Sequence, residues 1–176
     1  MNDKPRILIF TGEGKGKTTA ALGMALRASG HGMRTRVVQF LKSDTGSGET
    51  AILPKLPGVE FSRRGLGFVP QRRDDPRFPA HLRAAQEALY LVREAIRDGH
   101  YDLLVMDEIC GAIAAGLIDE LEVVKLLEQA PVAMRILLTG RDVPVGLIAL
   151  ADTVTEMCCI KHGFQQGRTA QKGVEF

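Results

Sequence analysis

A stretch rich in glycine and lysine, residues 11–19, reads TGEGKGKTT and follows the apolar run 7–10. It precedes an alanine-rich helical pattern, and this strand-to-helix position is typical of a phosphate-binding loop. Glycines in such a loop let backbone N–H groups approach an anion, and the helix N-terminus adds partial positive charge. We expect Lys17 to contact phosphates and the Thr18 hydroxyl to bind a magnesium ion. The usual motif begins with glycine where this chain has Thr11, but we favour a nucleotide site over a ligand-free turn.

A pair of acidic residues, Asp107 and Glu108, closes the apolar run 103–106. A carboxylate at the carboxyl end of a buried strand beside the phosphate loop suits a Walker B magnesium site, so we expect Asp107 to be a second metal ligand. The alternative is a helix-capping aspartate. Glu108 has three open readings: it could orient water in an ATPase, assist the metal, or contact a substrate hydroxyl.

The elements that must position these residues are short apolar strands alternating with helices, which indicates a parallel sheet. The expected strands are 7–10, 37–41, 59–61, 103–106, 135–139 and 153–157. The expected helices run from 18 to about 29, along an apolar stripe at Phe78, Leu82, Ala85, Leu89, Val92 and Ile96, and along a second stripe at Leu117, Leu121, Val124 and Leu127. Residues 42–58 and 64–79 have no clear pattern, and loops of that length are usually functional. The sequence therefore predicts one domain over 1–176, a three-layer α/β fold of the P-loop NTPase type (RecA-like) with a mostly parallel central sheet.

Composition narrows the class of protein. The 176 residues carry a formal net charge of +2, which is too small to indicate nucleic acid, and no apolar run reaches the roughly 18 residues of a membrane span. We therefore expect no nucleic-acid or membrane partner. The first residues, MNDKPR, lack a signal-peptide core, and three cysteines without zinc-site spacing agree with a reducing compartment. We expect a cytoplasmic protein.

These residues predict binding of a magnesium nucleotide and leave the reaction open among ATPases, nucleotide kinases, switches and transferases. Further segments along the chain narrow the choice, and they are 30–32 (GHG), 37–42 (VVQFLK), 48–49 (GE), 58–61 (GVEF), 67–68 (GF), 139–141 (TGR), 150–157 (LADTVTEM), 161–164 (KHGF) and 167–175 (GRTAQKGVE). With the phosphate loop and the Asp107 strand, this ordered set resembles the P-loop corrinoid adenosyltransferases over nearly the whole chain. The C-terminal segments are the most specific part of the match.

The resemblance implies transfer of the 5′-deoxyadenosyl group of ATP to a Co(I) corrinoid, with release of triphosphate, in adenosylcobalamin biosynthesis or salvage. Reduced cobalt is itself the nucleophile, so the enzyme's task is to stabilise a highly charged leaving group. The resemblance implies ATP, Mg²⁺ (or Mn²⁺) and a corrinoid as ligands, a homodimer, and a flavoprotein electron donor. An ordinary P-loop ATPase or nucleoside kinase is the alternative, and a non-catalytic nucleotide-dependent module is a third reading.

Site residues follow from the motif and from the resemblance together. The expected catalytic residues are Lys17, Arg141 and Glu108, with Arg141 as a further cation for the leaving group. Residues expected to contact the ligands are Gly12, Glu13, Gly14, Lys15, Gly16, Lys17, Thr18, Thr19 and, for the corrinoid, Phe68.

Two of these expectations, Arg141 and Phe68, come with an alternative, and the Phe68 loop also departs from the family. Arg141 could instead be a solvated loop arginine, and Phe68 could be a loop anchor packed on the core. The family often has a tryptophan two residues after the phenylalanine, where this chain has Pro70.

The cluster Arg63, Arg64, Arg72, Arg73 and Arg77 is expected to be a solvated basic loop, with contacts to corrinoid side chains or an acidic electron donor as the alternative.

Overall fold

The computed structural model describes residues 4–43 and 46–174. Its centre is a six-stranded sheet in the order β3-β2-β4-β5-β1-β6, and every neighbouring pair is parallel. The strands are β1 (Arg6–Thr11), β2 (Thr35–Gln39), β3 (Val59–Arg63), β4 (Leu103–Asp107), β5 (Arg135–Thr139) and β6 (Thr153–Glu156). All six expected strands are present, and the prediction of a mostly parallel sheet is confirmed.

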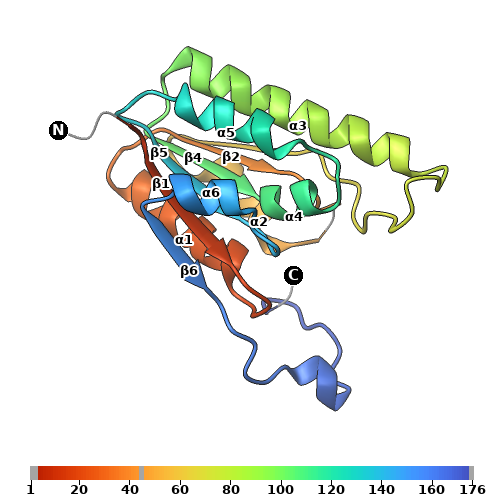
Figure 1. Cartoon of the computed structure of the whole chain (residues 1–176). Coiled ribbons are helices and arrows are strands. Elements are labelled where there is room, and N and C mark those ends of the chain that lie inside the picture. The colour runs from red at the N-terminus through yellow and green to blue at the C-terminus, as the bar shows by residue number, and fades with distance from the viewer. Residues whose placement is uncertain (1–3, 44–45, 175–176) are drawn as a thin grey trace.

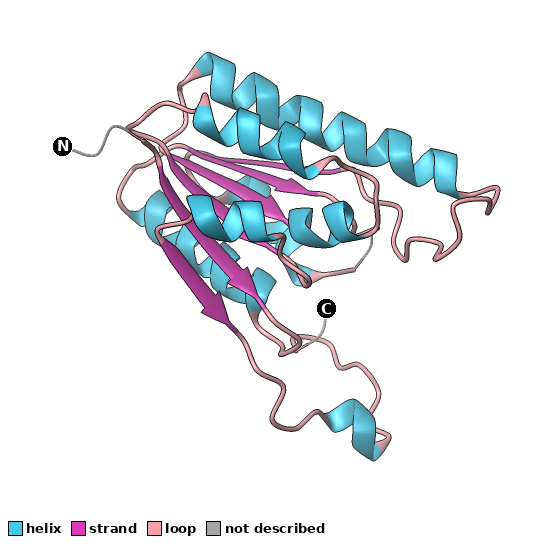
Figure 2. Cartoon of the chain, in the orientation of Figure 1, coloured by secondary structure: helices cyan, strands magenta, loops and turns pink. Residues whose placement is uncertain are grey.

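Helices cover both faces of the sheet (Figures 1 and 2). One apolar cluster packs the helices α3 (Phe78–Asp98), α4 (Ile109–Ala114), α5 (Glu120–Glu128) and α6 (Val145–Leu150) against one face. A second cluster packs α1 (Lys17–Gly30) and the turn η1 (Leu53–Lys55) against the other. The fold is therefore the expected three-layer P-loop α/β arrangement.

The long helix α3 ends at Gly99, whose positive φ of 64° is a left-handed cap that glycine adopts without steric cost. Its buried face includes Ala85, Leu89 and Val92, as the apolar spacing predicts. Leu82, which we placed on the same stripe, is 38% exposed, and the buried position on that turn belongs to His81. The prediction for this helix is therefore wrong at one position, and the rest of its buried face is as expected.

The second predicted stripe corresponds to α5, which starts at Glu120. Asp119 is its N-cap, and the Asp119 side chain accepts a hydrogen bond from Leu121 N–H at 2.9 Å. Leu117 precedes the helix and Leu121 is 64% exposed, so two of the four expected stripe positions are wrong. Leu127 is buried as predicted, and Val123 and Leu126 complete the buried face of the helix.

Several short elements were not predicted. Residues 42–58 contain α2 (Gly48–Ile52) and η1, and α4 and α6 occupy six residues each, too few for a clear helical period. Residues 64–77 contain no helix or strand, and beyond β6 the chain leaves the sheet, forms the turn η2 (Gly163–Gln166) and returns toward the end of β1 (Figure 1). Among the described residues, no helix has the length and apolarity to span a bilayer.

Candidate active site

The loop between β1 and α1 has the geometry that its glycines predict. Gly16, which precedes the first residue of α1, has a φ of 119°, and Gly12 has a φ of 94°. The Gly14 N–H donates to the carbonyl oxygen of Met157 at 2.6 Å. A Cβ atom on Gly12 or Gly14 would lie 2.6 or 2.5 Å from that same oxygen. These two glycines therefore let the chain beyond β6 lie against the loop, a role that the sequence analysis missed.

Lys17 is nearly buried, with 8% exposure, and its ammonium donates to the carbonyl oxygens of Gly12 at 2.5 Å and Gly14 at 2.8 Å. Burial lowers the pKa of Lys17, and the negative charge of Glu108 is the largest effect that opposes this shift. The side chain of Lys17, the residue predicted to contact phosphates, thus folds back onto the loop, and it also lines a cavity.

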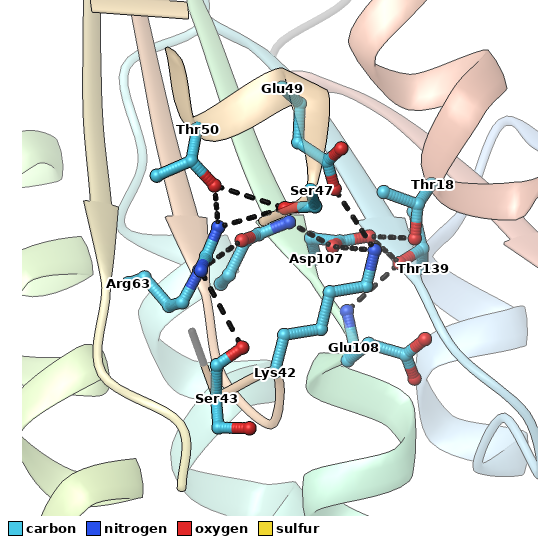
Figure 3. Close-up of polar contacts among 11 residues, drawn as sticks. Thr18, Lys42, Ser43, Ser47, Glu49, Thr50, Arg63, Asp107, Glu108 and Thr139 are labelled. Atoms are coloured by element: carbon cyan, nitrogen blue, oxygen red, sulfur yellow. Dashed lines mark hydrogen bonds and ion pairs between the residues drawn. The ribbon is translucent and has the colours of Figure 1, made fainter. Parts of the chain in front are cut away.

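Asp107 is completely buried, and its carboxylate is the acceptor for three side chains. The Thr18 hydroxyl donates to Oδ1 at 2.9 Å and the Thr139 hydroxyl to the same oxygen at 2.7 Å, while the Gln39 amide donates to Oδ2 at 3.0 Å. The structure therefore brings together Thr18 and Asp107, the two residues predicted to share a metal ion, as Figure 3 shows. The helix-capping alternative is wrong, because the carboxylate bonds to side chains of neighbouring strands and of α1.

Glu108 has a φ of 65°, in the left-handed region, and caps the start of α4 while its N–H donates to the Thr139 hydroxyl at 2.9 Å. Its carboxylate faces the same cavity as Lys17. Burial raises the pKa of Glu108, and the charge of Asp107 raises it further, whereas the nearby cations Lys42, Lys17 and Arg141 lower it.

Arg141 follows Gly140 at the end of β5, and a Cβ atom on Gly140 would lie 2.7 Å from the backbone nitrogen of Gly111. The guanidinium of Arg141 pairs with Glu13 at 3.2 Å, and both side chains are more than half exposed. Arg141 lines the cavity together with the loop, so the structure places the predicted cation at its edge.

Lys17, Thr18, Glu108 and Arg141 line a cavity of about 1080 Å³, whereas the buried Asp107 lies behind Thr18 and is not part of the wall. Glu13 to Thr19 form one part of its wall, and Gly67, Phe68 and Val69 form another, so every expected ligand-contacting residue except Gly12 lines it. Phe68 is fully exposed at 101%, so the alternative of a core anchor is wrong, while Pro70 beside it is buried. From the returning C-terminal segment, His162, Gly173 and Val174 add to the wall.

Sequence reasoning missed Lys42 and Glu49, which also line the cavity. The Lys42 ammonium lies 3.5 Å from Glu49 and 4.0 Å from Asp107 Oδ2. Lys42 comes shortly after β2, and ligands of parallel α/β sheets bind beyond the carboxyl ends of the strands. That rule could have identified it.

The arginine cluster is only partly the solvated surface that we expected. Arg72 pairs with Asp74 at 2.6 Å and Arg77 with Asp75 at 2.9 Å, all close in sequence. Arg63 is different, because it points into the sheet edge and hydrogen-bonds to Gln39. The expectation of a solvated side chain is wrong for Arg63.

Comparison with known proteins agrees with this site. A family model described as ATP:corrinoid adenosyltransferase BtuR/CobO/CobP matches residues 3–176. A corrinoid adenosyltransferase of a Sinorhizobium species is 41% identical, with 99% of this chain and 82% of the relative aligned. Those of Pseudomonas aeruginosa (37%; 97% and 83% aligned) and Escherichia coli K12 (36%; 100% and 88% aligned) are also similar. A phosphate loop and an exposed aromatic side chain on one cavity agree with this match, and the chain belongs to the ATP:corrinoid adenosyltransferase family.

Proposed function

We propose that this cavity holds ATP with its triphosphate at the glycine-rich loop and a Co(I) corrinoid against the wall that carries Phe68. As a member of its family, the chain transfers an adenosyl group from ATP to a corrinoid. The observation that carries the assignment of the two halves is that the phosphate loop and the exposed aromatic ring line one continuous space. A nucleotide and a flat macrocycle can meet only in such a shared space.

The reaction joins two substrates by displacement at carbon. The electron pair of Co(I) forms the bond to C5′, the C5′–O bond breaks, and its electrons leave with the triphosphate. The protein must therefore stabilise negative charge on the leaving oxygens. Lys17 can exchange the carbonyls of Gly12 and Gly14 for phosphate oxygens, because both lie on the loop itself.

Two charged neighbours, Glu108 and Arg141, contribute to stabilisation of the leaving group in different ways. Glu108 counteracts the effect of burial on the pKa of Lys17, which favours the charged ammonium that the leaving group needs. Arg141 is bound to an exposed glutamate, and exposed ion pairs contribute at most about 1 kcal/mol, so Arg141 can leave Glu13 for the triphosphate.

The oxygen donors at the loop fit Mg²⁺ or Mn²⁺. The Thr18 hydroxyl and the Asp107 carboxylate lie within 2.9 Å of one another, and hard cations prefer such ligands. Among the described residues there is no group of three or more His, Cys, Asp or Glu that could hold a metal, so phosphate oxygens and water would complete the shell. When bound, the ion neutralises charge on the triphosphate, while Thr18 and Asp107 orient it.

The corrinoid side has a different character. Phe68 and Val69 project from the loop 64–77, and Val174 approaches from the C-terminal segment. We propose that Phe68 packs against the corrinoid and that a flavoprotein supplies the electron that generates Co(I). We further propose that the protein is a single domain and acts as a homodimer in the cytoplasm.

The decisive experiment is incubation with Mg-ATP and chemically reduced cobalamin. We expect an absorbance change, a light-sensitive cobalt–carbon bond, and triphosphate that appears only when corrinoid is present. An ATPase would release phosphate with water alone, and a nucleoside kinase would form ADP and a phosphorylated acceptor. Tight ATP binding without triphosphate or spectral change would overturn the assignment.

A further inference from the structure

A row of polar side chains crosses the carboxyl edge of the sheet. Arg63, Gln39 and Asp107 are the last residues of β3, β2 and β4, and they face one another in the strand register. Arg63 Nε donates to Gln39 Oε1 at 3.0 Å, and Gln39 Nε2 donates to Asp107 Oδ2 at 3.0 Å. Figure 3 labels the two ends of this row, Arg63 and Asp107. The row therefore joins a cation on the outer strand β3 to the carboxylate beside the phosphate loop.

The hydrogen-bonding groups on either side of Gln39 fix the orientation of its side-chain amide. A guanidinium has only donors, so it requires the oxygen of the Gln39 amide and turns the NH₂ group toward Asp107. Without Arg63 the amide could rotate and place its oxygen against a carboxylate oxygen, which would repel it. Gln39 and Asp107 are both completely buried, so water does not compete for these contacts.

The guanidinium also holds the segment that follows β2. Arg63 Nη2 donates to the hydroxyls of Ser47, at 3.3 Å, and Thr50, and Nη1 donates to the Ser43 carbonyl at 3.5 Å. Ser47 immediately precedes α2, which carries Glu49, the partner of Lys42. Arg63 thus contacts Gln39, which hydrogen-bonds to Asp107, and also Ser43, which is part of the cavity wall.

We propose that Arg63 is a positioning residue for the nucleotide–metal site. Through Gln39 it orients the Asp107 carboxylate, and through Ser47 and Thr50 it holds α2 so that Lys42 and Glu49 stay beside that carboxylate. The inference rests on the proposed function, in which Asp107 serves the metal ion of Mg-ATP. Arg63 itself does not contact Asp107, because the side-chain amide of Gln39 lies between them.

The test compares Arg63→Met with Arg36→Met. Arg36 is a matched control because it also joins β2 to β3, through Ser62 at 2.9 Å and Glu60 at 3.4 Å, but it has no contact with Gln39 or Asp107. We expect Arg63→Met to raise the Mg²⁺ concentration for half-maximal adenosyl transfer about tenfold, as loss of outer-shell partners does at metal sites. ATP binding measured calorimetrically without metal should stay within about twofold of wild type, since the loop is untouched. Arg36→Met should leave both values unchanged.

Three further tests separate positioning from general stability. Hydrogen exchange of the α2 amides, measured without ligands, should be faster in Arg63→Met and unchanged in Arg36→Met. In a Gln39→Leu background, Arg63→Met should add less than about twofold to the Mg²⁺ shift, because the two residues act in series. Arg63→Lys should behave like Arg63→Met, since one ammonium cannot reproduce the planar fork.

The outcomes also distinguish the two proposals. An unchanged Mg²⁺ dependence in Arg63→Met, or an equal shift in Arg36→Met, would overturn the role of Arg63. A wild-type enzyme whose adenosyl transfer needs no divalent metal would instead overturn the metal site of the proposed function. Unchanged hydrogen exchange of the α2 amides in Arg63→Met would show that Arg63 does not hold that helix, whatever the metal dependence.

Discussion

The two sides of the cavity differ in how completely their side chains are partnered. On the phosphate side, Lys17, Thr18 and Asp107 are each fixed by hydrogen bonds of 2.5–2.9 Å before any ligand is bound. On the opposite side, Phe68 is exposed over its whole surface, and its side chain has no hydrogen-bonding group that would fix it. One side is preformed and the other is open.

Physical chemistry explains the contrast. A buried charge without partners is very unfavourable, so the fold must satisfy Asp107 and Lys17 even when no nucleotide is present. Exposed apolar surface costs only about 25 cal/mol per Å², which a folded chain tolerates when the surface serves a ligand or a partner. We therefore expect substitutions on the phosphate side to affect catalysis, and those on the open side to affect binding of the second substrate.

The largest effect is expected for Lys17→Ala. Removal of the ammonium should lower the rate of adenosyl transfer at least about 100-fold, because the leaving group loses a direct charge partner. Circular dichroism should show an intact fold, and Lys55→Ala, an exposed control outside the cavity, should keep wild-type turnover. Normal turnover in Lys17→Ala would contradict the expectation that the preformed phosphate side carries catalysis.

A smaller and more selective effect is expected for Phe68→Ala. The KM for corrinoid should rise about tenfold, since burial of an aromatic ring against a ligand contributes roughly 1.5–3 kcal/mol. The Kd for ATP and the Tm should not change, because the ring has no partner in the free protein. Leu66→Ala, in the same loop but outside the cavity wall, serves as the control. An equal effect on ATP binding would show that the two sides are not separate.

The smallest effect is expected for Glu108→Gln, measured as Tm against pH. The folded protein raises the pKa of Glu108, so its contribution to stability is present below the unfolded pKa and is lost as pH rises through the folded pKa. At neutral pH the buried carboxylate therefore opposes folding. Glu108→Gln should raise Tm by a few degrees at neutral pH and by less in acid. A difference in Tm that does not vary with pH would contradict this electrostatic cost of the preformed side.

Much of the fold and the core of the site could be predicted from local sequence. The apolar runs marked all six strands, and the loop 11–19 marked the phosphate site, because strand burial and loop chemistry depend on neighbours in sequence. The Asp107 position followed from the rule that ligands gather at the carboxyl ends of parallel strands. Lys42 obeys the same rule and was missed because residues 42–58 showed no pattern.

Other features depend on contacts that are distant in sequence. The approach of Met157 to Gly12 and Gly14 brings together positions about 145 apart in the chain, so the packing role of these glycines is invisible locally. Leu82 and Leu121 fitted apolar stripes but are exposed, since the face that a helix buries is chosen by its neighbours. The short helices α4 and α6 lack a full period to detect.

By itself, the sequence determined that this protein is a parallel α/β nucleotide-binding protein with a phosphate loop and a carboxylate beside it, and its ordered motifs indicated the family. Only the tertiary structure decided that Arg63 and Gln39 stand in line with Asp107. That alignment requires the strand order β3-β2-β4, in which β2 separates two strands that are 40 residues away from each other in the chain. Strand order is set by the packing of helices on both faces, a property of the whole sheet that no local pattern encodes.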